Sequence, residues 1–313
     1  MSPIRVARYA SEHKQSWDEM IARSRNGVFL FFRDYMEYHS DRFQDASLLF
    51  FQDADLWAVL PANREGNTVI SHGGLTFGGV ISRENLGASA MLKLFDVLCE
   101  WLRAQGIAKL IYKPVPYIYH RAPAEEDLYA LFRVGARLVR RDLSSTFDMT
   151  NRLPMQHGRV SQLKRGTKIF VVRETRDYDA FMPLVRLNLS TKHNVKPTHT
   201  EAELELLASR FPKNIRLFGA YREEQMCAGV VVYENRTVAH VQYIASADGA
   251  KREGALECIF DELLERQYAG IRYFDWGIST EQAGQWLNPG LVQNKESYGA
   301  RGIAYDCYEL DVG

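Results

Sequence analysis

The chain has 313 residues, of which 46% are hydrophobic, 25% charged and 12% aromatic, and Lys+Arg and Asp+Glu each total 39. This composition is typical of a globular protein with apolar residues for roughly two domains, and it excludes an intrinsically disordered chain. The zero formal net charge argues against a dedicated nucleic-acid binder, because such proteins usually carry a basic excess.

Two further features of the sequence indicate the cellular compartment of the protein. The first residues lack the apolar stretch of a signal peptide, and no apolar run reaches the roughly 18 residues that a membrane span needs. The cysteines are scattered without a Cys-x-x-Cys pair, at Cys99, Cys227, Cys258 and Cys307. We therefore expect a cytoplasmic protein without membrane contact, whose cysteines are small buried hydrophobes and which holds no metal.

In the first half of the chain, hydrophobic periodicity predicts alternating helices and strands. The longest helix has apolar residues at helical spacing and ends at Gly106, and a glycine-rich segment, Gly73–Gly79, follows the third strand. The predicted helices are 16–24, 33–42, 88–104 and 125–132, and the predicted strands are 47–52, 56–62, 68–72, 109–112 and 136–148.

The second half repeats this order after a linker and short helix over residues 151–166. A polar turn that contains glycine, 246–254, precedes the long helix, which ends at Gly270. The predicted helices are 177–188, 201–209 and 255–268, and the predicted strands are 215–221, 226–233, 237–245 and 272–276.

The repeated order predicts a duplication. Leu48 and Leu217 occupy equivalent positions 169 residues apart, and the two helix-ending glycines are 164 residues apart. A recurring separation of this size favours two copies of one domain over a short solenoid repeat. We predict an N-terminal domain over 1–150 and a C-terminal domain over 151–313. A generic α/β chain is the alternative.

Each half, with helices, three strands and then strand–turn–helix–strand, resembles the GNAT acetyltransferase fold. The resemblance implies an α/β fold of two tandem GNAT-like domains, each a mixed, mostly antiparallel sheet flanked by helices. In that fold the fourth strand splays from the fifth and its free backbone groups pair with a pantetheine arm. The turn that follows directs backbone N–H groups at a pyrophosphate.

The polar turn of the second half suits the phosphates of an acyl donor. The resemblance therefore implies that the C-terminal domain binds the acyl donor and that the N-terminal domain is on the acceptor side. The glycines of the turn permit close backbone approach, and its basic residues add positive charge. A solvated loop is the alternative, and the absence of Gly-Lys-Ser/Thr excludes a P-loop. The predicted acyl-CoA contacts are Tyr243, Ile244, Ala245, Gly249, Lys251, Arg252, Glu253, Gly254 and Ala255.

Within the second half the sequence is similar to FemAB-type transferases. The resemblance lies in residues 162–167, 239–246, 274–279 and 291–299, with Asn294 and Tyr298 in place of two Phe residues of the family's ending. Segments 30–39, 60–63, 71–79 and 192–199 most resemble the sugar N-acyltransferases of O-antigen biosynthesis. That branch uses acyl-CoA and a dTDP-linked 3-amino-3,6-dideoxyhexose, and 3-hydroxybutyryl is one acyl group that the resemblance suggests.

Attack of an amine on a thioester needs a neutral amine, a polarised carbonyl and a stabilised thiolate. His72 and His240 are the candidates for a base, although each can be a structural histidine and proton loss to water needs neither. Lys295 matches the Lys of the FemAB ending and is a candidate for binding phosphate or the oxyanion. Tyr298 is a candidate donor to the thiolate, with packing the favoured interpretation.

The predicted acceptor contacts lie in loops and at strand ends, where ligands gather in open sheets. Exposed-loop and capping roles are the alternatives. The candidates are Thr76, His193, Asn194, His199, Asp275 and Ser279. The expected partners are a nucleotide-linked amino sugar and acyl-CoA, with no nucleic acid, in a monomer or homodimer. The rival hypotheses are a FemAB-like aminoacyl-tRNA transferase and a degenerate GNAT pair that only binds ligands.

Overall fold

The computed structural model describes residues 2–193 and 197–313, except for the side chains of 190–193. The chain forms two compact units. Unit 1 comprises Met1–Asp142, Gln282–Gln285 and Ala304–Gly313, and unit 2 comprises Leu143–Glu281 and Trp286–Ile303. The end of the chain thus returns to unit 1, whereas the sequence pattern predicted two consecutive segments divided at residue 150.

Unit 1 contains strands of two sheets and one long helix. Its strands form the four-stranded sheet β1-β2-β3-β6 and the β4-β5-β7-β16 part of a ten-stranded sheet, and α3 buries the apolar face predicted for residues 88–104. The helices are α1 (Lys14–Arg23), α2 (Arg33–Met36), α3 (Ala88–Ala104) and α4 (Glu126–Arg133). The strands are β1 (Ile4–Arg8), β2 (Leu48–Gln52), β3 (Asp55–Leu60), β4 (Asn63–Glu65), β5 (Thr68–Ile70), β6 (Ile81–Ser82) and β7 (Lys109–Tyr112).

Two long strands, β8 (Arg137–Asp148) and β16 (Arg301–Asp311), have residues in both units. In unit 1, β16 pairs antiparallel with β7 from Tyr308↔Tyr112 to Asp311↔Lys109. This pairing explains why the last residues belong to unit 1: they add a strand beside β7.

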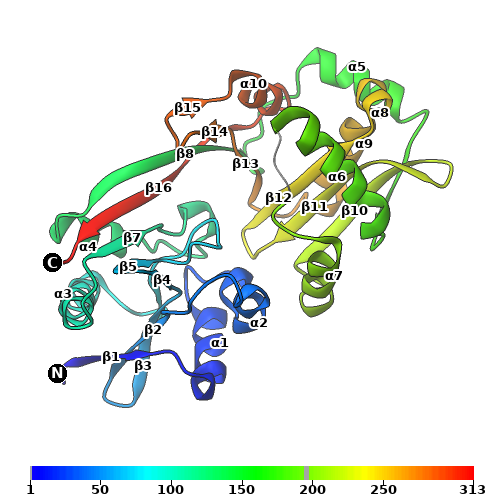
Figure 1. Cartoon of the computed structure of the whole chain (residues 1–313). Coiled ribbons are helices and arrows are strands. Elements are labelled where there is room, and N and C mark those ends of the chain that lie inside the picture. Colours follow the sequence, from blue (N-terminus) through cyan, green and yellow to red (C-terminus); the bar gives the residue numbers. More distant parts are fainter. Residues whose placement is uncertain (1, 194–196) are drawn as a thin grey trace. The chain divides into compact units, whose positions relative to one another are not determined.

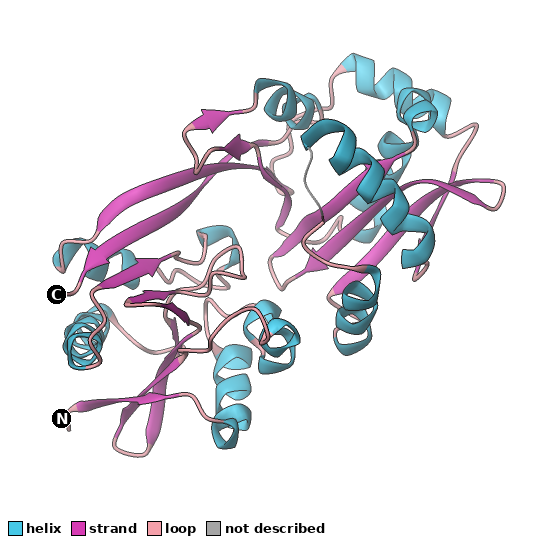
Figure 2. Ribbon diagram, in the orientation of Figure 1, coloured by secondary structure: helices cyan, strands magenta, loops and turns pink. Residues whose placement is uncertain are grey.

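Unit 2 contains the strand order β8-β13-β12-β11-β10-β9 (Figures 1 and 2). Its strands are β9 (Val171–Thr175), β10 (Ile215–Arg222), β11 (Gln225–Glu234), β12 (Val238–Ser246), β13 (Tyr273–Ile278), β14 (Thr280–Glu281) and β15 (Trp286–Leu287). Its helices are α5 (His157–Gly166), α6 (Tyr178–His193), α7 (Glu201–Arg210), α8 (Asp248–Glu253), α9 (Ala255–Glu262) and α10 (Pro289–Ser297).

Helices cover both faces of this sheet. In Figure 1, α6 lies in front of strands β10–β12 and α9 lies behind them. Phe260 of α9 stacks on Trp276 of β13 with ring centroids 3.9 Å apart, and it also contacts Phe274. Because side chains alternate along a strand, Asp275 points to the opposite face, on the side of α6.

Most predicted elements of both halves are confirmed within a few residues, and several segments differ. The predicted turn 246–254 contains α8, since Ala, Lys, Arg and Glu in this segment favour helix despite Gly249. The long helix 255–268 ends earlier, and a π-helical turn, Leu263–Gln267, completes it. The helix α10 and the strands β1, β4, β6, β9, β14, β15 and β16 were not predicted. Within the described ranges, no helix combines the length and apolar character that crossing a membrane requires.

Candidate active site

The central feature of unit 2 is a gap between two parallel strands. Strands β12 and β13 pair only from Val238↔Tyr273 to His240↔Asp275. Beyond that point β12 continues to Ser246, whereas β13 turns toward β8 and pairs Ile278 with Ser144. The edge of β12 after His240 is therefore not covered by β13, which is the splay that the GNAT pattern predicts.

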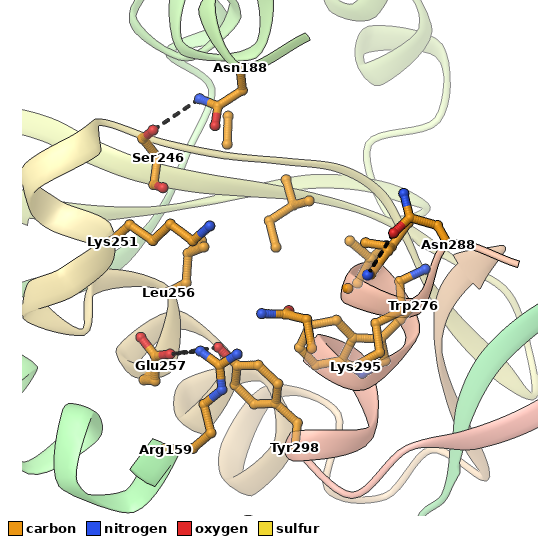
Figure 3. A pocket seen from close by; sticks show the side chains of 16 residues that line it. Arg159, Asn188, Ser246, Lys251, Leu256, Glu257, Trp276, Asn288, Lys295 and Tyr298 are labelled. Carbon is orange, nitrogen blue, oxygen red and sulfur yellow. Dashed lines mark hydrogen bonds and ion pairs between the residues drawn. The ribbon is translucent and has the colours of Figure 1, made fainter. Parts of the chain in front are cut away.

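A cavity of about 400 Å³ opens at this gap (Figure 3). One wall is the free part of β12, a second is the α8–α9 segment, and a third is α10. The lining residues are Arg159, Asn188, Val241, Ile244, Ala245, Ser246, Lys251, Leu256, Glu257, Trp276, Asn288, Gly290, Leu291, Asn294, Lys295 and Tyr298. The cavity thus combines an apolar strand wall with a few polar side chains, which is typical of a small-molecule site.

Part of the predicted donor set lies at this cavity. Ile244, Ala245 and Lys251 line it, and the Ile244 side chain is 42% exposed there. Arg252 is exposed on α8 beside Lys251 but is not a lining residue. Glu253 instead forms an ion pair with Arg222 of β10.

The two predicted glycines of the donor turn have different surroundings. A Cβ at Gly249 would meet no atom within 4 Å, so its backbone is open to approach. Gly254 has φ +95°, and a Cβ there would collide with the carbonyl oxygen of Gln162 on α5. Gly254 is thus explained by helix packing and a left-handed backbone, and Ala255, which follows it, is fully buried.

The register of three strands places His240, Asp275 and Thr146 in one row on the face opposite Trp276. His240 Nδ1 lies 2.6 Å from Asp275 Oδ2. The hydroxyls of Thr146 and Ser144 each donate to Asp275 Oδ1 at 2.6 Å. A carboxylate only accepts, so His240 presents its proton on Nδ1 and leaves Nε2 with a lone pair.

Asp275 is completely buried. Burial raises the pKa of this carboxyl, but hydrogen bonds from His240, Ser144 and Thr146 outweigh burial and hold the pKa below its ordinary value. The sequence predicted that Asp275 contacts the acceptor. In the structure both of its carboxylate oxygens accept hydrogen bonds from protein groups, so Asp275 acts on His240 instead. The side chain of His240 is 15% exposed and is the accessible member of the pair.

Lys295 lies inside the cavity wall without a carboxylate partner among the contacts of the described residues. Its Nζ donates to the carbonyl oxygens of Gly277 at 2.7 Å and Ile278 at 2.8 Å. Burial lowers its pKa to about 8, although Asp275 opposes this effect. Ser279, which follows these carbonyls, is buried, and its backbone N–H donates to Leu143.

Tyr298 is packed rather than poised for proton transfer. Its ring lies 4.7 Å from that of Trp276, and its hydroxyl donates to Glu257 Oε1 at 2.8 Å. Burial and the neighbouring Glu257 raise the pKa of Tyr298 well above its ordinary value. This geometry supports the packing interpretation that the sequence favoured.

The predicted residues of the loop after α6 are only partly described. His193 is the last residue of α6, and its side chain is outside the described part; Asn194 lies outside it entirely. His199 is buried, and its Nδ1 lies 2.7 Å from the hydroxyl of Tyr243. This contact links the segment before α7 to β12. The Tyr243 side chain is directed at His199 and does not line the cavity.

His72 and Thr76 belong to unit 1. His72 is buried at φ +56°, with its ring centroid 5.2 Å from His39 and 5.5 Å from Phe43. Burial is the largest cause that lowers the pKa of His72 to about 3, with His39 and Lys113 adding to it. A histidine with this pKa is a neutral core residue near pH 7. Thr76 is exposed in the glycine-rich segment.

Sequence reasoning did not identify three of the residues that shape the cavity, namely Arg159, Glu257 and Trp276. Each of the three comes from a different element. In the sequence, an aromatic residue in a strand is interpreted as part of the hydrophobic core, and a single acid in a helix carries no signal of a cavity. Among the described residues, no group of three His, Cys, Asp or Glu side chains is arranged to hold a metal ion.

The splayed strands and the cavity of unit 2 are features of the GNAT acetyltransferase fold. Residues 159–283 match the family model described as "Acetyltransferase (GNAT) domain". This segment contains the splayed strands, α8 and α9, and the chain is accordingly an enzyme of the N-acyltransferase class. The comparison with curated proteins found no match.

Several solved structures share the whole fold. FemX has 10% sequence identity and a TM-score of 0.70, with 98% of this chain and 97% of FemX covered. L-PGS from Bacillus licheniformis has 14% identity and a TM-score of 0.60, with 96% and 92% covered. A tandem GNAT protein from the clavulanic acid biosynthesis pathway has 12% identity and a TM-score of 0.54, with 99% of both chains covered. At these identities the likeness shows the fold: two tandem GNAT-like domains.

Proposed function

We propose that the chain transfers an acyl group from an acyl-CoA, bound in the cavity of unit 2, to the amine of a nucleotide-linked amino sugar. The observation that carries this proposal is the gap between β12 and β13. It leaves the backbone of β12 beyond His240 free to pair with a pantetheine arm, and the cavity at the gap extends to Lys251 of α8. The proposed place of the donor phosphates is this end, at Lys251 and Arg252, with the backbone of Gly249 open beside them.

In the proposed reaction, the amine nitrogen attacks the thioester carbonyl carbon, the C–S bond breaks and CoA leaves as the thiolate. His240 Nε2 takes the proton from the amine, and Asp275 stabilises the imidazolium that forms. His240 faces the α6 side of the sheet, whereas the cavity lies between β12, α9 and α10 and reaches Asn188 of α6. The amine and the thioester would thus meet across the gap.

The proposed role of Lys295 is to stabilise the charge that develops on the carbonyl oxygen. Its ammonium is buried beside the gap and is held by two carbonyl groups, so it needs little reorganisation when an oxyanion forms. Backbone N–H groups of β12 near Ile244 and Ala245 would add to this effect. In this proposal Tyr298 supports the site by packing and is not a proton donor.

For the acceptor we propose a dTDP-linked 3-amino-3,6-dideoxyhexose, with 3-hydroxybutyryl as one transferred group, in the synthesis of O-antigen. This part rests on the resemblance of segments 30–39, 60–63, 71–79 and 192–199 to the sugar N-acyltransferases. The proposed acceptor contacts are His199 beside β12, Ser279, and the segment of His193 and Asn194. Thr76 and His72 belong to unit 1 and are not part of this proposal for unit 2.

A surface feature favours an aminoacyl-tRNA as a second candidate donor. Lys164, Arg165 and Lys168 are exposed on or just after α5, which packs against α8 with Lys251 and Arg252. None of these five forms an ion pair with another described residue, and a basic surface of this kind suits a polyanion. The balanced net charge of the whole chain weighs against this alternative.

A thiol-release assay tests the proposal. Purified protein is offered several acyl-CoAs with a panel of nucleotide-linked amino sugars, and free CoA is followed with a thiol reagent. We expect release that depends on both substrates. If no pair releases CoA and a charged tRNA transfers its aminoacyl group instead, the second candidate replaces the first.

A matched pair of variants tests the donor position. Replacing Lys251 and Arg252 with Ala should raise KM for acyl-CoA roughly 10-fold with little change in kcat, since these residues bind a part of the donor that does not react. Lys213→Ala removes an exposed lysine elsewhere in unit 2 and should leave KM unchanged. Equal KM values in all three proteins would show that the donor phosphates bind elsewhere.

A further inference from the structure

Two buried hydroxyl groups of β8 contact the carboxylate that holds His240. Ser144 Oγ and Thr146 Oγ1 each lie 2.6 Å from Asp275 Oδ1, and Asp275 Oδ2 lies 2.6 Å from His240 Nδ1. Ser144, Thr146 and Asp275 are 0%, 6% and 0% exposed. The hydrogen bonds therefore form one continuous chain within unit 2, from β8 through β13 to the partly accessible ring of His240 on β12.

Strand pairing produces this chain of hydrogen bonds. β13 pairs with β8 through Asp275↔Thr146 and Ile278↔Ser144, and with β12 through His240↔Asp275. Because side chains alternate along a strand, Ser144 and Thr146 lie on one face of β8 and Ser145 lies on the other. Two hydroxyls that are two residues apart can thus reach the same carboxylate oxygen.

The hydroxyls determine which form of Asp275 is stable. A carboxylate only accepts, so both O–H groups donate to it, and this donation favours the ionised form. Burial is the largest influence on the pKa of Asp275 and raises it, so loss of the hydroxyls would raise the pKa. If Asp275 then took up a proton, its O–H would donate to His240 Nδ1 and the ring proton would move to Nε2. A protonated Nε2 has no lone pair for the proton of an amine.

The charge of Asp275 also acts on Lys295. Burial lowers the pKa of this lysine to about 8, and Asp275 opposes the effect. An uncharged Asp275 would therefore lower the pKa of Lys295 further. The ionised state of one carboxyl group thus serves both the proposed base and the proposed oxyanion-stabilising group.

We propose that Ser144 and Thr146 are positioning residues for acyl transfer, because their hydroxyls hold Asp275 as a carboxylate directed at the base. The Nε2 atom of His240 is thereby kept free to take the proton of the amine. This inference rests on the proposed function, because it takes His240 to be the base. Both residues act through Asp275 and are not catalytic residues themselves.

Nitrogen-15 NMR of the histidine rings in the full-length protein tests the inference without any substrate. His240→Gln identifies the His240 signals by their absence. When the wild-type pair of His240 and Asp275 gains a proton as the pH is lowered, we expect the ring to become an imidazolium. In a variant that combines Ser144→Ala with Thr146→Val, we expect a neutral ring protonated on Nε2, because Asp275 keeps the added proton. Each single variant should give a mixture.

The thiol-release assay measures the effect on the reaction. We expect kcat to fall about 10-fold in each single variant and about 100-fold in the double variant, with KM for both substrates changed less than about 2-fold. The alkaline fall of kcat/KM, which Lys295 sets at about pH 8, should move to lower pH in the double variant. A role of the hydroxyls in stability alone would move neither the ring protonation nor this limb.

Two control variants separate positioning from packing. Thr146→Ser keeps the hydroxyl and should retain kcat within about 3-fold of the wild type. Ser145→Ala removes a buried hydroxyl from the other face of β8 and should leave kcat and the ring protonation unchanged. A thermal unfolding scan shows that each variant is folded, and the single variants carry the test if the double variant does not fold.

The outcomes are distinct. If the wild type transfers the acyl group and the Ser144 and Thr146 variants keep its kcat and its ring protonation, the positioning role is wrong while the proposed function stands. If the ring protonation changes but kcat does not, His240 is not the base, which also overturns the assignment. If the wild type releases no CoA with any substrate pair, the proposed function fails, and the ring protonation still decides whether the two hydroxyls control Asp275.

Discussion

Lys295 illustrates how a single side chain obtains unusual properties from its surroundings. Two carbonyl oxygens hold its ammonium group, and burial lowers its pKa to about 8. Neutral carbonyls orient the ammonium but cannot balance its charge as a carboxylate does. The charge is consequently available to a developing oxyanion, but only at pH values below this pKa.

The pH profile of acyl transfer checks this role. We expect kcat/KM to fall above about pH 8 as the ammonium of Lys295 loses its proton. Lys295→Met should lower kcat by roughly 100-fold and abolish this alkaline limb, because the titrating group is gone. An alkaline limb that persists unchanged in the variant would assign the titration to another residue.

His72 makes a prediction about stability that does not depend on the reaction. Its pKa is about 3 in the folded protein and its ordinary value is 6.5, so the unfolded chain binds the proton more readily. Its contribution to stability is complete above pH 6.5 and is lost as the pH falls from 6.5 toward 3. The slope is about 1.4 kcal/mol per pH unit within that window.

Chemical denaturation at pH 7.5 and 5.0 measures this effect. His72→Asn should lose less stability between the two pH values than the wild type does, and Asn tolerates the left-handed backbone at this position. His157→Asn replaces an exposed histidine and is the control, which should follow the wild type. Parallel losses in all three proteins would contradict the prediction.

At the scale of elements, α5 and the α8–α9 junction meet backbone to backbone. A Cβ at Gly166 would lie 2.5 Å from the carbonyl oxygen of Gly254, and Gly254 itself has φ +95°. Two glycines are therefore required for one helix contact. This contact positions α8 beside the cavity, and Arg159, on the same helix as Gly166, reaches Glu257 of α9.

A matched pair of substitutions tests this contact. Gly254→Ala combines a strained φ with a backbone collision, so the free energy of unfolding should fall by about 3 kcal/mol. Gly249→Ala has open space for its Cβ and should leave stability unchanged or raise it by up to about 1 kcal/mol through helix propensity. Urea denaturation of both variants gives the comparison, and equal effects would refute this account of Gly254.

At the scale of the whole molecule, the chain crosses between its two units more than once, so neither unit is one continuous segment. The final strand supplies Leu310 to the core of unit 1, and Val312, which follows the strand, adds to it; they are 4% and 1% exposed. Four residues of β16 also pair with β7. The last residues are thus structural parts of a domain that is otherwise encoded at the start of the chain.

Removal of residues 304–313 should consequently destabilise unit 1. The loss of two buried side chains and of a strand pairing should lower the free energy of unfolding by about 4 kcal/mol or more. Asp311→Ala, which breaks only an exposed ion pair with Arg137, should change it by less than about 0.5 kcal/mol. Circular dichroism melting of both proteins measures the difference, and an unaffected truncation would show that unit 1 folds without β16.

Sequence periodicity was sufficient to predict most helices and strands and their repeated order, because these depend on local apolar patterns such as that of α3. The GNAT-like fold and the choice of Lys295 came from resemblance to known families, whereas His240 and Lys251 were chosen for their places at a strand and in a turn. Contacts between residues that lie far apart along the chain could not be predicted from local patterns. For example, Gly254 led to the prediction of a ligand-binding turn. In the structure, glycine is required at this position because the backbone of α5 approaches it closely.

What only the tertiary structure decided is which groups face one another. The row of His240, Asp275 and Thr146 arises from the register of three strands that lie far apart along the chain. The cluster of Arg159, Glu257 and Tyr298 joins three helical segments in the same way. Local residue order specifies the elements by itself, whereas a site needs side chains that strand pairing and helix packing bring together, and those contacts carry no local signal in the sequence.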